Sequence, residues 1–121
     1  MQINQEARDK HSIQAYDETR IKVNNTDYSE SLIVSKDNII SPWPLHCVTE
    51  LNALLLKPML DLNPEIIIIG HQAQGKMIPF AMLQSITNQR IGIECMSIGA
   101  ACRTFNVLLS EQRAVVLGIV I

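Results

Sequence analysis

Three runs of almost uninterrupted apolar residues dominate the second half of this 121-residue chain. They cover residues 65–69, 91–96 and 114–121. A strand that is apolar along its whole length is typical of a sheet covered on both faces, and parallel neighbours need a crossover, usually a helix. Between the runs, apolar residues recur at helical spacing, from near Pro79 onward with Phe80 on the apolar side, and over residues 100–109. The pattern therefore predicts a βαβαβ unit.

The chain before Pro64 has a different sequence pattern. Short segments with β-branched or aromatic residues alternate with turn-forming pairs at 13–16, 20–23, 28–35 and 38–40. This alternation is typical of an antiparallel meander, and its exposed edge offers a surface for a homodimer. A short helix is expected over residues 53–60, with Asn52 as its cap. We interpret residues 1–121 as one α/β domain with a flexible N-terminus at 1–11.

Composition excludes several classes of partner. The formal net charge is −2, the ten Lys and Arg residues are scattered, and only five residues are aromatic, so nucleic acid is not an expected partner. No apolar run approaches the roughly 20 residues that a membrane span needs. The first ten residues are polar and contain two acids, which does not fit a targeting segment. A cytoplasmic protein is the expectation.

Cysteine and histidine usage argues against a metal site. Cys47, Cys95 and Cys102 are odd in number and form no Cys-x-x-Cys pair, so reduced thiols are expected rather than a disulfide framework. The three histidines have no paired carboxylates near them in the sequence. We therefore expect no bound metal.

A loop after the first apolar run mimics a phosphate-binding motif. Residues 70–76 have the spacing of a P-loop through Lys76, but Met77 stands where a P-loop needs Ser or Thr to hold magnesium. Pro79 then removes an N–H where the phosphate-cradling helix should begin. We expect neither nucleotide hydrolysis nor another cofactor.

The third helical segment carries the most informative residues. Arg103 lies near the start of this helix, where unpaired N–H groups disfavour a cation unless an anion compensates for it. Two explanations remain open: an internal ion pair with Glu94 or Glu65, or an external anion. Cys102 is either a weak candidate nucleophile activated by the helix terminus or an inert buried residue.

Two further polar residues are candidates for a role in binding. His71 follows an apolar strand, at the end of the strand where open α/β sheets usually bind ligands. Asn106 is a poor helix former in a helix interior, so we expect it to make a specific hydrogen bond, to backbone or to ligand. Trp43, between two prolines, is interpreted as a rigid corner that covers the core, with a partner-binding anchor as the alternative.

Five segments together resemble the Mth-type domain-of-unknown-function family. They are residues 31–34 (Ser-Leu-Ile-Val), 42–44 (Pro-Trp-Pro), 64–70 (Pro-Glu-Ile-Ile-Ile-Ile-Gly), 92–94 (Gly-Ile-Glu) and 100–108 (Ala-Ala-Cys-Arg-Thr-Phe-Asn-Val-Leu). The resemblance implies a three-layer α/β domain with a mixed central sheet. The family includes uncharacterised bacterial and archaeal proteins, a mitochondrial assembly factor for respiratory complex I and an adipogenesis-associated cytosolic protein. None of these supplies an established catalytic mechanism.

Transferred residue by residue, the resemblance makes Gly70, Arg103, Thr104 and Asn106 the residues expected to line a shared surface. This chain departs from the family in two places. Relatives commonly read Gly-Thr-Gly where this chain has Gly70, His71 and Gln72, so a hydroxyl and a flexible backbone position are lost and an imidazole is gained. The acidic residue common just after the strand at 91–96 is also absent, which weakens any general base there.

Two hypotheses of function follow. The first, which we prefer, is a non-enzymatic interaction or assembly module with a protein partner, linked by resemblance to complex I biogenesis. The second is a small-anion binding protein or enzyme, with a pocket between the Gly70 loop and the Arg103 helix. The second predicts saturable anion binding that Arg103→Ala abolishes.

Overall fold

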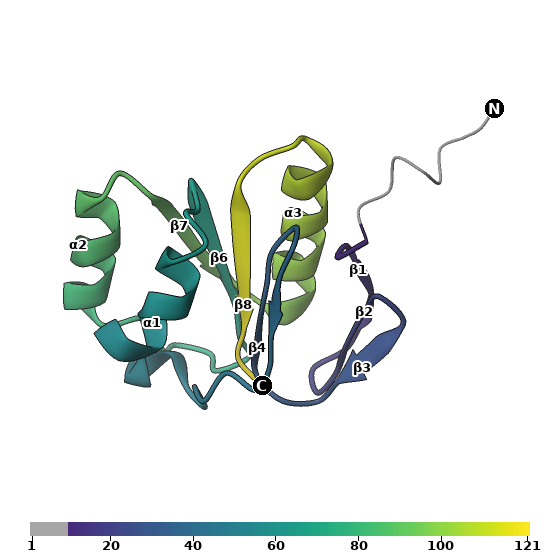
Figure 1. The fold of residues 1–121 in the computed structure, drawn as a ribbon. Coiled ribbons are helices and arrows are strands. Elements are labelled where there is room, and N and C mark those ends of the chain that lie inside the picture. The colour runs from purple at the N-terminus through teal and green to yellow at the C-terminus, as the bar shows by residue number, and fades with distance from the viewer. Residues whose placement is uncertain (1–9) are drawn as a thin grey trace.

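The computed structural model describes residues 10–121, which form three α-helices, one 3₁₀-helix and two sheets (Figure 1). The N-terminal part contains β1 (Ile13–Tyr16), β2 (Ile21–Val23), β3 (Thr26–Tyr28), β4 (Leu32–Val34), β5 (Ile39–Ile40) and the 3₁₀-helix η2 (Val48–Glu50). The rest contains α1 (Ala53–Leu60), β6 (Ile66–Gly70), α2 (Phe80–Asn88), β7 (Gly92–Met96), α3 (Ile98–Ser110) and β8 (Val115–Ile119).

The central sheet has the strand order β5-β4-β8-β6-β7 and is mixed. β6 pairs in parallel with β7 and β8, whereas β4 pairs antiparallel with β8 and β5. Helices α1 and α2 lie on one side of this sheet and α3 lies on the other (Figure 1). The predicted βαβαβ unit and the three-layer α/β architecture with a mixed central sheet are confirmed.

Alternation along the central strands divides the interior into two cores. On β6, Ile67 and Ile69 pack on the α1 and α2 side, while Ile68 packs against α3. On β8, Val116 packs on the α1 and α2 side, and Leu117 packs against α3. Because successive side chains in a strand point to opposite faces, continuous apolar runs supply both cores at once.

The N-terminal meander is divided between the two sheets. β1, β2 and β3 form a separate antiparallel sheet beside α3 (Figure 1). The prediction of one segment over residues 28–35 was wrong, because β3 ends at Tyr28 and β4 begins at Leu32. All three residues of β4 are buried, and this burial explains why the strand joins the central sheet.

Two elements are more exposed than their sequence patterns indicate. β7 was expected to be covered on both faces, but it is the end strand of the sheet, and Gly92, Glu94 and Cys95 are exposed. Phe80, expected on the apolar side of α2, is the first residue of the helix and is 74% exposed. The N-terminus was predicted to be flexible over residues 1–11, and residues 1–9 lie outside the described part of the chain. His11 is buried, and its Nδ1 lies 2.7 Å from the Ser35 carbonyl oxygen.

Candidate functional site

The connections that leave β6 and β7 diverge to opposite faces of the central sheet. The chain after β6 leads to α2, and the chain after β7 leads to α3 on the other side (Figure 1). Adjacent parallel strands whose connections separate in this way leave a crevice at their carboxyl ends, where open α/β sheets bind ligands. This edge of the sheet is therefore the first place to look for a site.

A crevice of about 580 Å³ lies there, lined by residues 71–76, residues 95–97 and Glu18. Of the predicted site residues, only His71 lines it. Lys76 contributes a cation, and Glu18 contributes a carboxylate of opposite sign. Sequence reasoning missed Lys76 as a binding residue, although it stands at the lysine position of the P-loop look-alike.

The backbone N–H groups at the start of α3 are partly used by protein oxygen atoms. The Ile98 N–H donates to Gln72 Oε1 at 2.9 Å, and the Ala100 N–H donates to Ser97 Oγ at 3.3 Å. Such caps satisfy donors that would otherwise attract an anion. Gln72, one of the departures from the family pattern, thus acts as a cap from a neighbouring loop. Ser97 had a recognisable sequence signal as a helix cap, whereas Gln72 had none.

His71 is held as a neutral imidazole. The Ala73 backbone N–H donates to His71 Nδ1 at 3.1 Å, so the ring hydrogen belongs on Nε2. Burial lowers the pKa of His71 below its usual value, because an imidazolium would lose hydration there. His71 can therefore offer one neutral N–H donor to the crevice at pH 7.

Gly70 directly precedes the crevice-lining residues 71–76 and is buried. A Cβ at this position would lie 2.7 Å from Ala101 Cβ and 3.3 Å from Ile98 Cα. Its lack of a side chain allows β6 and the first turn of α3 to approach closely. Gly70 has this packing role in the structure.

Arg103 contacts a tyrosine instead of a carboxylate. Its Nη1 donates to the Tyr16 hydroxyl at 2.6 Å, and its guanidinium carbon lies 6.0 Å from the Tyr16 ring centroid. The internal ion pair with Glu94 or Glu65, one of the two explanations offered for Arg103, is absent, and Glu65 accepts from Arg113 Nε at 3.0 Å. Within residues 10–121, Arg103 forms no ion pair. It connects α3 to the small sheet and lies outside the lining of the crevice.

The other two polar residues of the arginine motif also bond within the protein. Asn106 Oδ1 accepts from the Ile13 N–H at 2.7 Å, and its Nδ2 donates to the Ile13 carbonyl at 3.0 Å. The amide group thus pairs with β1 as a neighbouring strand would, beside the register irregularity between Ile13 and Ala15. Thr104 Oγ1 lies 3.4 Å from Met96 Sδ. The specific hydrogen bond expected of Asn106 is present, and it is made to backbone.

Asn106→Ala should lower the free energy of unfolding by about 1–2 kcal/mol, because it leaves the N–H and C=O of Ile13 without partners. Urea denaturation measures this change. Amide hydrogen exchange at Ile13 should also become faster. Asn106→Asp is the matched control, because its carboxylate still accepts from the N–H but cannot donate to the C=O. An Ala variant as stable as wild type would contradict the structural role.

The cysteines of this region do not form a nucleophilic site. Cys102 is fully buried in the core, and burial raises the pKa of its thiol to about 12, so the thiolate is not accessible at neutral pH. The pKa of Cys95 is also raised, by burial and by the nearby Glu94 carboxylate. No group of three or more metal-ligating side chains exists among residues 10–121.

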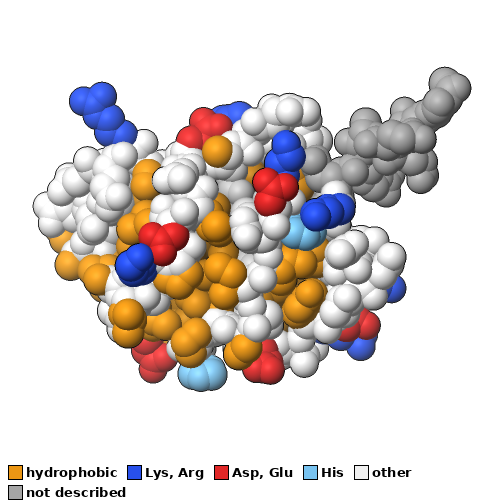
Figure 2. All heavy atoms as spheres, in the orientation of Figure 1, with side chains coloured by type: hydrophobic (Ala, Val, Ile, Leu, Met, Phe, Trp, Pro, Cys, Tyr) orange, Lys and Arg blue, Asp and Glu red, His pale blue; other side chains and the backbone are white. Residues whose placement is uncertain are grey.

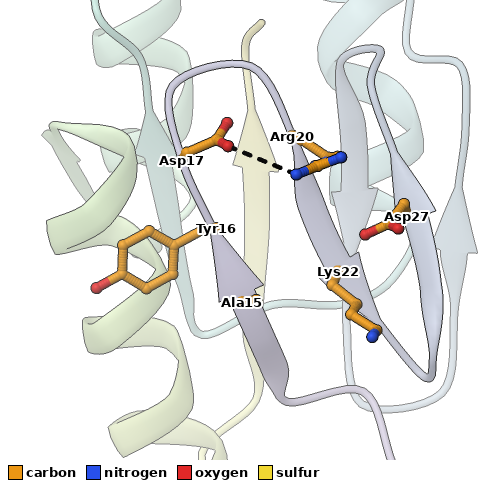
Figure 3. Close-up of a pocket in the computed structure, with 6 residues that line it drawn as sticks. All are labelled: Ala15, Tyr16, Asp17, Arg20, Lys22 and Asp27. Atoms are coloured by element: carbon orange, nitrogen blue, oxygen red, sulfur yellow. Dashed lines mark ion pairs between the residues drawn. The ribbon is translucent and has the colours of Figure 1, made fainter.

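A second, smaller cavity of about 310 Å³ lies on the small sheet (Figure 3). Figure 3 shows the Asp17 and Arg20 side chains directed toward one another, and their ion pair is 4.0 Å long. Hydrogen bonds from Thr19 lower the pKa of Asp17. Lys22 and Asp27 complete a lining of mixed charge, and Tyr16 points away toward α3 (Figure 3). The cavity is a surface depression of balanced charge and contains no reactive side-chain pair.

The fold defines a three-layer α/β domain with a crevice at the carboxyl ends of β6 and β7. The chain belongs to the family described as "Protein of unknown function (DUF498/DUF598)", whose model matches residues 13–120. The solution structure of a Bordetella pertussis protein described as a Mth938-like domain has the same fold, with a TM-score of 0.78 and 19% identity, over 99% of this chain and 89% of that chain. The resemblance to the Mth-type family is thereby confirmed.

Two further relatives are similar over most of their length. The NMR structure of a Xanthomonas campestris protein has a TM-score of 0.81 and 31% identity, covering 89% of this chain and 82% of that chain. A Francisella tularensis protein named "13 kDa major membrane protein" is 27% identical over 101 residues, which are 83% of this chain and 82% of that protein. No helix in residues 10–121 is long and apolar enough to cross a bilayer. The expected cytoplasmic location stays a prediction.

Proposed function

We propose that this chain is a non-catalytic interaction module that binds a protein partner. The observation that carries the proposal is that polar groups at the start of α3 and in the arginine motif bond within the protein. Gln72 and Ser97 cap α3, Asn106 pairs with Ile13, and Arg103 donates to the Tyr16 hydroxyl. Nucleophilic catalysis needs a nucleophile and a base within hydrogen-bond reach, and the helix motif at residues 100–108 supplies no such pair.

Large apolar side chains at the same end of the domain support protein binding. Leu54, Met77 and Phe80 are 78%, 71% and 74% exposed, and we call them the apolar rim. They belong to the start of α1, the loop before α2 and the start of α2, which lie toward the carboxyl ends of the strands (Figure 1). Figure 2 shows hydrophobic side chains on the face of the molecule around α1. We propose that the apolar rim forms an interaction surface, as exposed apolar patches typically do.

The resemblance supplies a candidate partner. Among the Mth-type relatives is an assembly factor for respiratory complex I, and the Francisella relative bears the name of a membrane protein. A module that binds an assembly intermediate at a membrane would be consistent with both. The candidate partner is therefore a subunit of complex I before its assembly is complete.

Affinity purification of the tagged full chain from its native cells tests this proposal. We expect complex I subunits to co-purify with wild type and to be lost with the double variant Met77→Ser/Phe80→Ser. Val107→Ser is the matched control, because Val107 is also an exposed apolar residue but lies on α3, across the sheet. Retention by all three proteins would contradict binding at the apolar rim, and recovery of other proteins would redirect the choice of partner.

The crevice favours a second candidate function, the binding of a small anion. Its position between diverging connections is the observation that supports it, and its lining includes the donors His71 and Lys76. A thermal-shift measurement with inorganic phosphate and simple carboxylates would detect saturable stabilisation. We expect Lys76→Ala to remove the effect. Arg103→Ala should retain it, contrary to the expectation from sequence, because Arg103 does not line the crevice. No stabilisation of wild type would reject the second candidate and leave the first unaffected.

A further inference from the structure

We propose that the free edge of β7 pairs with β7 of a second copy of this chain, antiparallel and centred on Cys95. The pairing would join two five-stranded sheets into one continuous sheet. The proposal does not depend on partner binding at the apolar rim, because it uses backbone groups of a different element. Either proposal can therefore fail alone.

The backbone of β7 presents regularly spaced donors and acceptors on its outer side. β7 pairs only with β6, in a register of five consecutive residue pairs without irregularity. The Gly92 N–H donates to the Glu65 carbonyl, and the Met96 carbonyl accepts from the His71 N–H. Since the direction of backbone groups alternates along a strand, those of Ile93 and Cys95 point away from β6. An extended neighbour could bond to all of them.

β7 lacks most of the features that protect edge strands. It has no proline and no bulge, and three of its five residues are exposed. The opposite edge strand, β5, is only two residues long, and β3 at the end of the small sheet is three residues long. Short strands offer little pairing, whereas a regular five-residue edge is a template for another strand. β7 is therefore the favoured edge, ahead of the meander.

A second copy is the occupant that matches this edge by symmetry, and charge selects the register. Two identical strands related by a two-fold axis pair antiparallel. An axis at Glu94 would place two carboxylates directly opposite each other, which is unfavourable. An axis at Cys95 instead sets Glu94 against Met96 of the second copy. An axis at Ile93 would also separate the carboxylates, so a further observation must decide between these two.

Existing hydrogen bonds favour the axis at Cys95. An axis at Ile93 would need the Ile91 N–H, which already donates to the Ile86 carbonyl at 3.4 Å. An axis at Cys95 uses Ser97, whose N–H has no backbone partner and whose carbonyl accepts from the Ala101 N–H. A carbonyl oxygen can accept a second hydrogen bond, whereas an N–H has a single proton to donate. Ser97 is also extended, with φ −63° and ψ 160°.

Light scattering on the purified full chain tests the dimer. We expect wild type and Cys95→Ser to have the mass of two chains, and Cys95→Pro to have the mass of one. Proline at this position removes an outward N–H while leaving the bonds between β6 and β7 intact. Circular dichroism establishes that the Pro variant is folded. A monomeric wild type at high protein concentration, or a folded Pro variant that stays dimeric, would overturn the proposal.

Cross-linking tests the register without depending on the proline variant. Cys47→Ser leaves exposed Cys95 and fully buried Cys102 as the remaining thiols. Around an axis at Cys95 the two Cys95 Cα atoms lie about 5.5 Å apart, whereas an axis at Ile93 separates them by about 14 Å. A bismaleimide too short for the larger distance should link two chains. A dimer by light scattering that cannot be linked would overturn the Cys95-centred pairing.

Discussion

Trp43→Ala is expected to lower the free energy of unfolding by about 3–5 kcal/mol. The Trp43 side chain is 2% exposed, and its indole Nε1–H donates to the Leu55 carbonyl at 2.9 Å. The indole also fills the space beside Gly118, where an added Cβ would lie 2.8 Å from the ring. The substitution would create a cavity and remove the hydrogen bond to α1. A domain of this size has a total stability of about 5–15 kcal/mol, so this loss would unfold a measurable fraction of the molecules.

Urea denaturation followed by circular dichroism measures the effect, because Trp43 is the sole tryptophan and its fluorescence disappears with the substitution. Leu54→Ala is the control, since an exposed side chain should change stability by less than about 0.5 kcal/mol. Similar stabilities for the two variants would mean that the indole does not hold α1 against the sheet. Burial of Trp43 favours the rigid-corner interpretation over the partner-binding anchor.

The features of the fold that sequence reasoning predicted share one physical origin. β6 and β8 lie between other strands and are covered on both faces, so their apolar runs are continuous and easy to recognise. The helix at 53–60 was predicted with its correct bounds, because Asn52 accepts the Leu55 N–H at 2.9 Å as a cap should. Local sequence patterns are enough to predict an element when its own residues determine its burial and its helix cap.

The features that were missed depend on neighbours far apart in the sequence. β7 was interpreted as a covered strand although it contains Glu94, and the strand order shows that it is an edge. Gln72 caps α3 from 26 residues away, and Tyr16 meets Arg103 across 87 residues. The sequence contains no local signal for either contact. It identified the helix that carries the arginine motif, but not the partners that occupy its polar groups.

The same limit explains why the predicted site residues are not one cluster in the structure. Gly70 packs against α3, and Asn106 bonds to β1. Of the predicted site residues, only His71 lines the crevice. A motif that is continuous along a helix points in several directions, because residues three or four apart share a face and their neighbours do not. Arg103 and Asn106, three residues apart, accordingly both contact β1, whereas Thr104 contacts Met96 of β7.

Gly70→Ala is expected to lower the free energy of unfolding by about 2–3 kcal/mol, at the upper end of the usual range for an added methyl group in a packed core. The new Cβ would lie 2.7 Å from Ala101 Cβ, 2.9 Å from Ile119 Cδ1 and 3.3 Å from Ile98 Cα. Rotation of the isoleucine side chain can relieve only one of these contacts. The other two belong to the first turns of α3, so the helix must move away from β6.

Gly92→Ala is the matched control for this prediction, and urea denaturation of both variants measures the difference. Gly92 is also a strand glycine, but its nearest neighbour, Ile66 Cγ1, lies 3.5 Å from an added Cβ. Alanine there should be neutral or slightly stabilising, because it reduces the conformational entropy of the unfolded chain. Equal stability of the two variants would mean that α3 is not seated closely on β6. The crevice would then lose the rigid wall on which any binding at this edge depends.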